Sequence, residues 1–366
     1  MRKPHRNTSR TTLWCVVLVV LMLGSALLSP ATSRSAQALQ PASTDIVPCP
    51  PTDPFFHPYV RPLEGHSAPV CSLAFHPEGH CLAGGSVDGI ITLWDPRTTD
   101  ATPIRTLEAF DHPVLYLGFS ADGDRLVSCS TDGSAMLWDT TSYEPAMSLT
   151  ASDARPVTAD LRSDAQQMVM ASADGQLSIW NLRTGAPFDV PFRIALPAGV
   201  EVRVIRYDPL NTDHIWLGLN DGTIERWSLL SERRLDQLEA HTDAVSTLVL
   251  SPSPDHALHS RWMLSGSNDE NVFLWDPSDT DAIACQWRFG SPVSAVALAP
   301  SPGCPVVGLA DGTLMRLLIE PCRLLTGIAR IGSAIAAIAV HPCGQAIAAS
   351  TVEGIVTLIA LDAIAD

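Results

Sequence analysis

The chain has almost no lysine, because Lys3 is the only one in 366 residues. Schiff-base and lysine-nucleophile chemistry are therefore excluded from everything beyond residue 3. Positive charge is scarce overall, with 23 Lys plus Arg against 39 Asp plus Glu, and the formal net charge is −16. Sequence-independent binding to nucleic acid needs cationic groups that neutralise phosphates, so this balance argues against a nucleic-acid partner. It also argues against adhesion of the globular part to an anionic membrane surface.

The chain also lacks the local motifs that mark common catalytic centres. It contains no glycine-rich phosphate loop, no nucleophile elbow and no HExxH helix. Two histidine-containing segments, 76–80 and 256–259, fall where turns are expected, and no third ligand lies nearby at a convincing spacing. We therefore expect no metal, no cofactor and no catalytic activity.

The main feature that the chain does have is a short sequence motif repeated seven times. Each copy places an acidic turn six residues before a large apolar residue that ends a strand. The acid–apolar pairs are Asp88–Trp94, Asp132–Trp138, Asp174–Trp180, Asp221–Trp227, Asp269–Trp275, Asp311–Leu317 and Glu353–Ile359. The copies follow at intervals of 44, 42, 47, 48, 42 and 42 residues. Glycine usually follows the acid, and it permits the positive φ of a two-residue hairpin turn.

A second apolar strand precedes each copy and ends in a turn rich in Pro, Gly, Asp and Ser. Six of these strands carry an apolar residue five positions before their end: Val70, Val114, Val202, Val245, Val293 and Ile335. The third copy has Pro156 at that position, with Val157 beside it, so its register stays open. Short apolar strands separated by such turns predict four-stranded sheets repeated along the chain.

A period near forty residues with Trp-Asp at its end resembles the WD40 repeat, of which each copy forms one propeller blade. The resemblance implies an all-β fold over residues 59–366, a seven-bladed WD40-type β-propeller. It also implies closure by an N-terminal strand that completes the last blade, which would protect the sheet edges. The segment 59–63 stands where that strand is expected.

The resembling family places a hydrogen-bonded set of Trp, Ser or Thr, Asp and His inside a blade. Two copies supply such a tetrad. The first consists of His66, Ser86, Asp88 and Trp94, and the fifth consists of His241, Ser265, Asp269 and Trp275, with Ser267 as the alternative serine. In the second copy Phe110 falls in the position of the histidine. Asp, His and Ser also compose hydrolase triads, but the resemblance implies a structural role for both sets.

Residues 1–38 have a different composition. Basic residues precede an apolar run from Leu13 to Leu28, and Ala36-Gln37-Ala38 offers a small-x-small cleavage site. This layout predicts a signal peptide or, if it is not cleaved, an N-terminal signal anchor that would be the only contact with a membrane. A Pro-rich linker is expected over residues 39–58. We therefore expect an extracytoplasmic location, with the protein secreted, periplasmic or anchored facing outward.

The nine cysteines allow a disulfide to be predicted. Cys71 and Cys129 are expected on strands, as buried free thiols. Cys304 and Cys322 lie in turns on the same face of the sixth blade, and we predict a bond between them. Two other cysteines near that face are competing partners: Cys49 and Cys343.

In the resembling family, partners dock on the face formed by the loops that enter each first strand and by the turns that carry the acid. The candidates at these positions are Phe110, Asp111, His112, Thr131, Asp153, Arg155, Glu201, Asn220, Asp243 and Asn268. Phe110 and His112 are the best anchors because aromatic residues dominate binding hot spots, although Phe110 could instead fill the vacant histidine position. We predict a non-catalytic scaffold that binds a protein or peptide on this face.

Two alternatives remain open. A propeller enzyme or carbohydrate-binding protein would need carboxylates that converge at the mouth of the central channel. Asp111, Asp153, Glu201 and Asp243 are the only set available, and such a ring would show perturbed pKa values in a concave pocket. A sensor domain that serves a separately encoded membrane protein is the other alternative.

Overall fold

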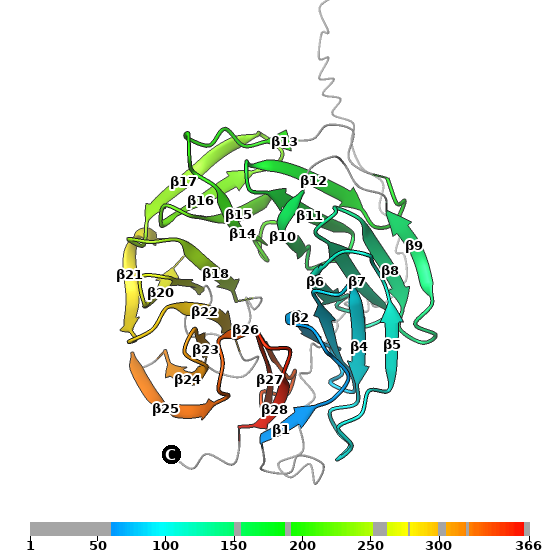
Figure 1. Cartoon of the computed structure of the whole chain (residues 1–366). Coiled ribbons are helices and arrows are strands. Elements are labelled where there is room, and N and C mark those ends of the chain that lie inside the picture. Colours follow the sequence, from blue (N-terminus) through cyan, green and yellow to red (C-terminus); the bar gives the residue numbers. More distant parts are fainter. Residues whose placement is uncertain are drawn as a thin grey trace, which may run out of the picture. The chain divides into compact units, whose positions relative to one another are not determined.

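The computed structural model describes residues 60–149, 155–186, 192–251, 262–276, 279–298, 305–319 and 322–361. Within these ranges all the regular elements are strands, and they form seven four-stranded antiparallel sheets. The sheets are arranged as blades around a central axis (Figure 1). The prediction of an all-β, seven-bladed propeller is therefore confirmed. The leader, the linker and Tyr59 lie outside the described residues.

The first three blades are each built from four consecutive strands, which run from the innermost to the outermost in chain order. Blade one contains β2 (Val70–Phe75), β3 (Leu82–Ser86), β4 (Ile90–Trp94) and β5 (Arg105–Glu108). Blade two contains β6 (Val114–Phe119), β7 (Arg125–Ser130), β8 (Ala135–Asp139) and β9 (Pro145–Leu149). Blade three contains β10 (Pro156–Leu161), β11 (Gln167–Ser172), β12 (Gln176–Asn181) and β13 (Phe192–Arg193).

The next three blades repeat this order. Blade four contains β14 (Val202–Tyr207), β15 (His214–Leu219), β16 (Thr223–Ser228) and β17 (Arg233–Glu239). Blade five contains β18 (Val245–Leu250), β19 (Met263–Ser267), β20 (Asn271–Asp276) and β21 (Asp279–Arg288). Blade six contains β22 (Val293–Ala297), β23 (Val306–Leu309), β24 (Thr313–Leu318) and β25 (Arg323–Arg330).

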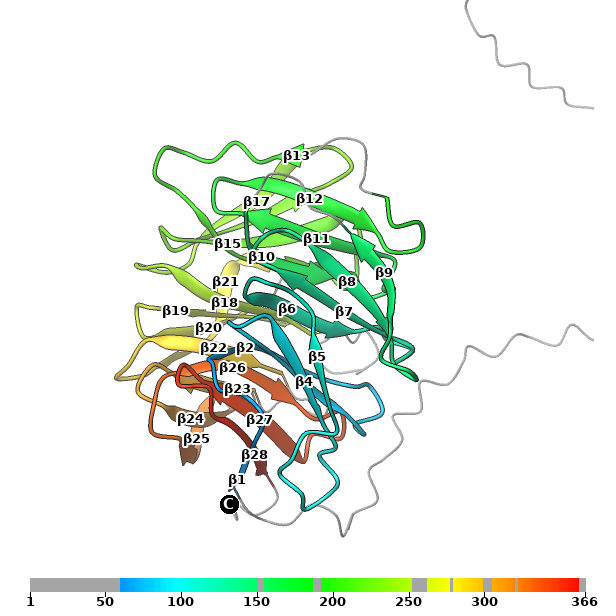
Figure 2. The same ribbon diagram turned by 45° about the vertical axis from the view of Figure 1, so that its right-hand side comes forward.

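Blade seven takes its outermost strand from the other end of the chain. Its inner strands are β26 (Ile335–Val340), β27 (Ala346–Thr351) and β28 (Val356–Ala360). The fourth strand is β1 (Val60–Leu63), which pairs with β28 so that Val60 faces Ile359 and Leu63 faces Val356. Both views show β1 and β28 side by side (Figures 1 and 2). This pairing joins the two ends of the described chain within one sheet.

The turns between second and third strands show why glycine recurs after the acid. Gly89 adopts a φ of +82°, and a side chain there would overlap the carbonyl group of Phe110 in the adjoining loop. In blade five, where glycine is replaced, Glu270 adopts a φ of +70°. The hairpin geometry thus requires the left-handed conformation even where the side chain makes it costly.

The core lies in the seams between neighbouring blades. The repeated large apolar residue is buried there in every copy, as Trp94, Trp138, Trp180, Trp227, Trp275, Leu317 and Ile359. The seam between blades seven and one packs Leu73 and Trp94 against Ala348 and Leu358. Blades six and seven bury an aliphatic side chain where the other five bury tryptophan. The equivalent seams of these two blades are therefore filled without an indole.

Candidate functional site

Blade five contains a continuous buried hydrogen-bond chain that joins four predicted side chains. The indole N–H of Trp275 donates to Ser265 Oγ at 2.8 Å, and Ser265 Oγ lies 2.8 Å from His241 Nε2. The other ring nitrogen of His241 is 3.1 Å from the Asp269 carboxylate. Burial raises the pKa of Asp269, but the Thr242 N–H, the His241 ring and Asn271 outweigh it, and the pKa lies below its ordinary value. These hydrogen bonds hold the turn that carries Asp269 against the strands of blade five.

Blade one does not form the corresponding chain, so the expectation of a complete tetrad there is wrong. Trp94 donates to the backbone carbonyl of Glu64 at 2.7 Å, and Ser86 bonds to Asp88. Neither ring nitrogen of His66 has a partner in ordinary hydrogen-bonding geometry, and the ring meets Trp94 edge-on with centroids 5.4 Å apart. Within β3, Gly84 occupies the position that Ser265 has within β19, so the bridging hydroxyl is missing.

In two other blades the tryptophan indole has a different hydrogen-bond acceptor environment from that in blade five. In blade two the Trp138 indole donates to Ser128 Oγ at 2.9 Å, while Phe110 stands in the histidine position. In blade four the Trp227 indole donates to the buried Glu225 carboxylate at 2.7 Å, and that carboxylate also pairs with Arg234. Each of these two indoles thus finds an acceptor, whereas the buried Trp180 indole of blade three has no hydrogen-bond partner among the described residues.

We call the end of the propeller where the first strands begin the loop face; the turns that carry the repeat acids lie at this end. Most described candidate residues are exposed there, namely Asp111, His112, Arg155, Glu201, Asp243 and Asn268. Thr131 and Asn220 are half-buried, and Asp153 lies outside the described residues. The topology therefore brings candidates from blades two to five to one end of the molecule, as the repeat pattern predicts.

Two of the candidates hold the loop face together. Phe110 is half-buried and packs on the core cluster of blades one and two that includes Ile91 and Trp138. It therefore fills the vacant histidine position and is a weaker anchor than its exposed neighbour His112. Asn220 accepts the Glu201 N–H at 2.9 Å and donates to the Gly199 carbonyl at 3.1 Å, so it fixes the loop that presents Glu201.

The loop face is rich in exposed carboxylates. The exposed turn acids are Asp88, Asp132, Asp174, Asp221, Asp311 and Glu353. The Ser172 hydroxyl and the Arg193 guanidinium help to hold the pKa of Asp174 below its ordinary value, although burial acts in the opposite direction. His112 Nδ1 lies 3.5 Å from the Asp132 carboxylate, and Arg203 lies 3.7 Å from Glu201. His112, Arg193 and Arg203 thus each lie beside an acid of this face.

A ring of seven bulged residues surrounds the axis at this face, and the sequence patterns did not reveal it. Every innermost strand shifts its register after its first residue, so one residue is left unpaired in each blade. The bulged residues are Cys71, Leu115, Val157, Arg203, Ser246, Ser294 and Ala336. Bulges redirect side chains and recur beside functional sites. The bulged residues are apolar in blades one to three and seven and are serines in blades five and six, and Arg203 of blade four is the charged member.

The bulge corrects one expectation about cysteine. Cys129 is a buried free thiol, but Cys71 is exposed, because the bulge turns it out of the sheet. Burial in part still raises the pKa of the Cys71 thiol.

The disulfide prediction was also wrong in its partner. Cys322 is bonded to Cys285, with their Cα atoms 5.8 Å apart, and Cys304 lies outside the described residues. Cys285 belongs to the outermost strand of blade five and Cys322 directly precedes the outermost strand of blade six. The bond thus joins adjacent blades, and a pattern read within single blades could not find it.

Three carboxylates of the enzyme alternative are described, and Asp111, Glu201 and Asp243 do not form a group close enough to share an ion. Within the described parts of the chain, one group of three His, Cys, Asp or Glu side chains is close enough to share an ion, and it consists of His76, Glu78 and His80. It lies in the β2–β3 turn, at the end opposite the loop face. Asp111, Glu201 and Asp243 are exposed on separate loops.

Comparison with known proteins agrees with this architecture. The WD40 family (WD domain, G-beta repeat) matches residues 58–95, 101–139 and 232–276. The chain is a seven-bladed propeller that contains WD40 repeats. The WD40 chain is 27% identical over 222 residues to WD repeat-containing protein slp1 of Schizosaccharomyces pombe, a match that covers 60% of this chain and 35% of slp1. It is 26% identical over 249 residues to THO complex subunit 3 of Arabidopsis thaliana, covering 67% of this chain and 75% of that subunit.

These relatives overturn the expected location. Both are intracellular proteins, which points away from an extracytoplasmic site for this WD40 propeller, so the expectation drawn from the leader is wrong. Among the residues that the structure describes, none lies in a helix that is long and apolar enough to cross a membrane. An apolar run indicates hydrophobicity of a segment, whereas its destination depends on whether the export machinery recognises it.

Proposed function

We propose that this WD40 propeller is a non-catalytic scaffold that binds a protein or peptide on its loop face. The observation that carries the proposal is the ring of seven bulged residues, with exposed carboxylates in the loops and turns of the same face. Such a surface is presented by a closed ring of sheets, so little backbone ordering opposes binding. The name of one relative, a subunit of the THO complex, is consistent with work inside a protein assembly.

The chemistry of the loop face suggests what the partner carries. Exposed acids attract Lys or Arg side chains and disfavour nucleic acid, whose phosphates would meet like charge. The apolar bulged residues Cys71, Leu115 and Val157 lie on consecutive blades, and Val157 is 41% exposed. We infer that the partner presents a basic segment, which would pair with the exposed acids. The same segment would carry an apolar side chain that contacts the apolar bulged residues.

The carbohydrate or enzyme alternative is less well supported. It needs several carboxylates directed at one point, whereas Asp111 and Asp243 lie on separate exposed loops and Glu201 stands beside Arg203. Asp153, the fourth member of that set, lies outside the described residues. We therefore retain the non-catalytic proposal.

The test compares two double variants with the same change in charge. Asp111→Arg with Glu201→Arg alters the loop face, and Asp124→Arg with Asp213→Arg alters exposed positions in first-to-second-strand turns at the opposite end. Cross-linked capture from the native host, quantified by mass spectrometry, should show partners that the loop-face variant loses and the control retains. Rim charges act mainly on association rate and on salt dependence, so the affinity difference should shrink in high salt.

Two outcomes of this comparison would contradict the proposal. Equal capture by both variants would mean that the loop face is not the docking surface. Loss of partners only in the control variant would move the docking surface to the other end. Unfolding of either variant, checked by circular dichroism, calls for the single substitutions instead.

A further inference from the structure

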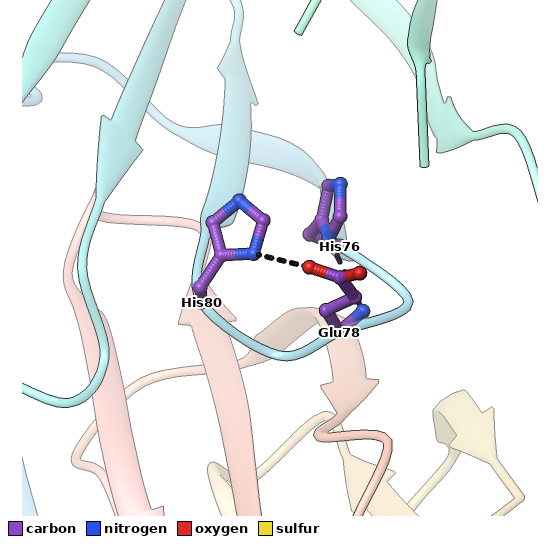
Figure 3. A group of neighbouring side chains, drawn as sticks. All are labelled: His76, Glu78 and His80. Carbon is purple, nitrogen blue, oxygen red and sulfur yellow. Dashed lines mark hydrogen bonds and ion pairs between the residues drawn. The ribbon is translucent and has the colours of Figure 1, made fainter. Parts of the chain in front are cut away.

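A turn at the end opposite the loop face gathers three potential metal ligands. His76, Glu78 and His80 lie between β2 and β3, and one ligand atom from each falls within 4.8 Å of the others. The two imidazole centroids are 3.9 Å apart, and His80 Nδ1 is 3.5 Å from Glu78 Oε2. Figure 3 shows the Glu78 carboxylate beside both rings, with a dashed line joining it to His80. We propose that these side chains form a site for a divalent transition-metal ion of the zinc class.

The surroundings of His76 prepare it to act as a ligand. Its Nε2 lies 3.0 Å from the carbonyl oxygen of Gly123, so Nε2 carries the hydrogen and Nδ1 keeps its lone pair. Metal-binding histidines usually donate their second N–H to a carbonyl or carboxylate in this way, which fixes the tautomer.

The metal would replace one weak hydrogen bond. His76 Nδ1 accepts the backbone N–H of Glu78 at 3.1 Å, and an ion on Nδ1 would displace this part-buried bond. The His80 side chain is about one third exposed, at 35%, which allows its ring to adjust. Two imidazoles and one carboxylate with a remaining open position are a ligand set typical of zinc and of other first-row ions.

Blade seven contains the same turn without the same ligands. In the segment 341–345 the Cys343 N–H bonds to His341 Nδ1 at 3.2 Å, and His341 Nε2 lies 3.0 Å from the Gly79 carbonyl oxygen. The turn glycines, Gly79 and Gly344, have nearly equal φ values of +75° and +74°. The conformation of the turn is therefore independent of a metal, and Gln345 stands where blade one has His80. His80→Gln transfers the residue of blade seven to blade one, which makes it a conservative test.

The position of the turn gives binding a mechanical consequence. His76 bonds to the β6–β7 turn of blade two through Gly123, and Gly79 is bonded by His341 of blade seven. An ion held by this turn would stiffen the junction of three blades, including the seam beside β1 and β28. We therefore expect the metal to raise the melting temperature.

The experiment uses the full chain, freed of metal by chelator and titrated with Zn²⁺ by calorimetry. We expect one site that His80→Gln and Glu78→Gln each weaken by more than about tenfold, the loss that removing even a neighbouring partner causes. Zn²⁺ should raise the melting temperature of the wild type but not of His80→Gln. Co²⁺ in place of Zn²⁺ should give visible bands of nitrogen and oxygen ligation without a thiolate charge-transfer band. Cys343→Ser, the control in blade seven, should keep the site.

Either of two results would overturn the proposal. Unchanged zinc affinity in both His80→Gln and Glu78→Gln would show that these side chains are not ligands, as would absence of binding to the wild type. Loss of binding in Cys343→Ser, with a thiolate band from Co²⁺, would assign the ion to blade seven. Melting in chelator shows that each variant is folded before it is titrated.

Discussion

His341 Nε2 lies 3.0 Å from the carbonyl oxygen of Gly79, although 262 residues separate them. The contact joins the β26–β27 turn of blade seven to the β2–β3 turn of blade one. His76 makes the same contact with Gly123 between blades one and two, also at 3.0 Å. The seam between blades seven and one, where the ring closes, therefore contains the same histidine-to-carbonyl contact as the seam between blades one and two.

Gly79→Ala is expected to weaken this seam. Gly79 has a φ of +75°, and an added Cβ would overlap the His341 ring. Left-handed backbone and overpacking together should lower the free energy of unfolding by about 3 kcal/mol. Gly332→Ala is the matched control, because its φ is +88° and no atom lies within 4 Å of an added Cβ. Gly332→Ala should cost only about 1 kcal/mol in urea unfolding. Equal losses would show that the contact with His341 contributes nothing.

Ser265→Ala should destabilise the protein more than Ser128→Ala. Ser265 Oγ serves both the Trp275 indole and His241, whereas Ser128 Oγ accepts one bond from the Trp138 indole. Ser265→Ala leaves two buried groups without a hydrogen-bond partner, and Ser128→Ala leaves one. We therefore expect the free energy of unfolding to fall by about 2–4 kcal/mol and about 1–2 kcal/mol respectively. Both serines are fully buried, which makes the comparison fair. Chemical denaturation measures both, and a larger loss for Ser128→Ala would contradict the network.

His66→Phe should flatten the dependence of stability on pH. Burial lowers the pKa of His66 from 6.5, despite the opposing effect of Asp88. The unfolded chain therefore binds a proton below about pH 6.5 that the folded chain does not, and stability falls as pH falls through that range. This single group can contribute up to about 1.4 kcal/mol per pH unit.

Phenylalanine is the matched replacement because Phe110 occupies this position in blade two. His66 makes no ring-nitrogen hydrogen bond in ordinary geometry, so His66→Phe should cost little at pH 7.5. Melting temperatures between pH 7.5 and 5.5 provide the measurement. A slope equal to that of the wild type would mean that His66 titrates alike in both states.

Reduction of the Cys285–Cys322 bond should lower stability. The cysteines are 37 residues apart, and on the chain-entropy account a loop of that length contributes about 4 kcal/mol. Peptide mapping without reductant should recover the two cysteines in one linked species. Denaturation with and without dithiothreitol gives the free-energy difference. Cys71→Ser, which alters an exposed free thiol, should not change that difference. Recovery of Cys285 and Cys322 as free thiols from the oxidised protein would contradict the bond.

The sequence by itself determined the number of blades and the strands within them. Its acid–apolar spacing recurs because each blade needs the same hairpin and the same buried side chain, and Trp94 through Ile359 occupy equivalent seams. It also placed His112, Glu201 and Asn268 at one end, because the end of a strand follows directly from its position in the repeat. Such features depend on residues near one another in the chain.

Only the tertiary structure decided the contacts between blades and the local register. Cys285 meets Cys322 across a seam, and a repeat pattern carries no information about which positions of adjacent blades touch. The bulge that exposes Cys71 and Arg203 arises from backbone pairing, which side-chain periodicity does not report. The register of β3 sets Gly84, with no hydroxyl, between His66 and Trp94. Folding a turn back on itself brought His76, Glu78 and His80 within reach of one ion.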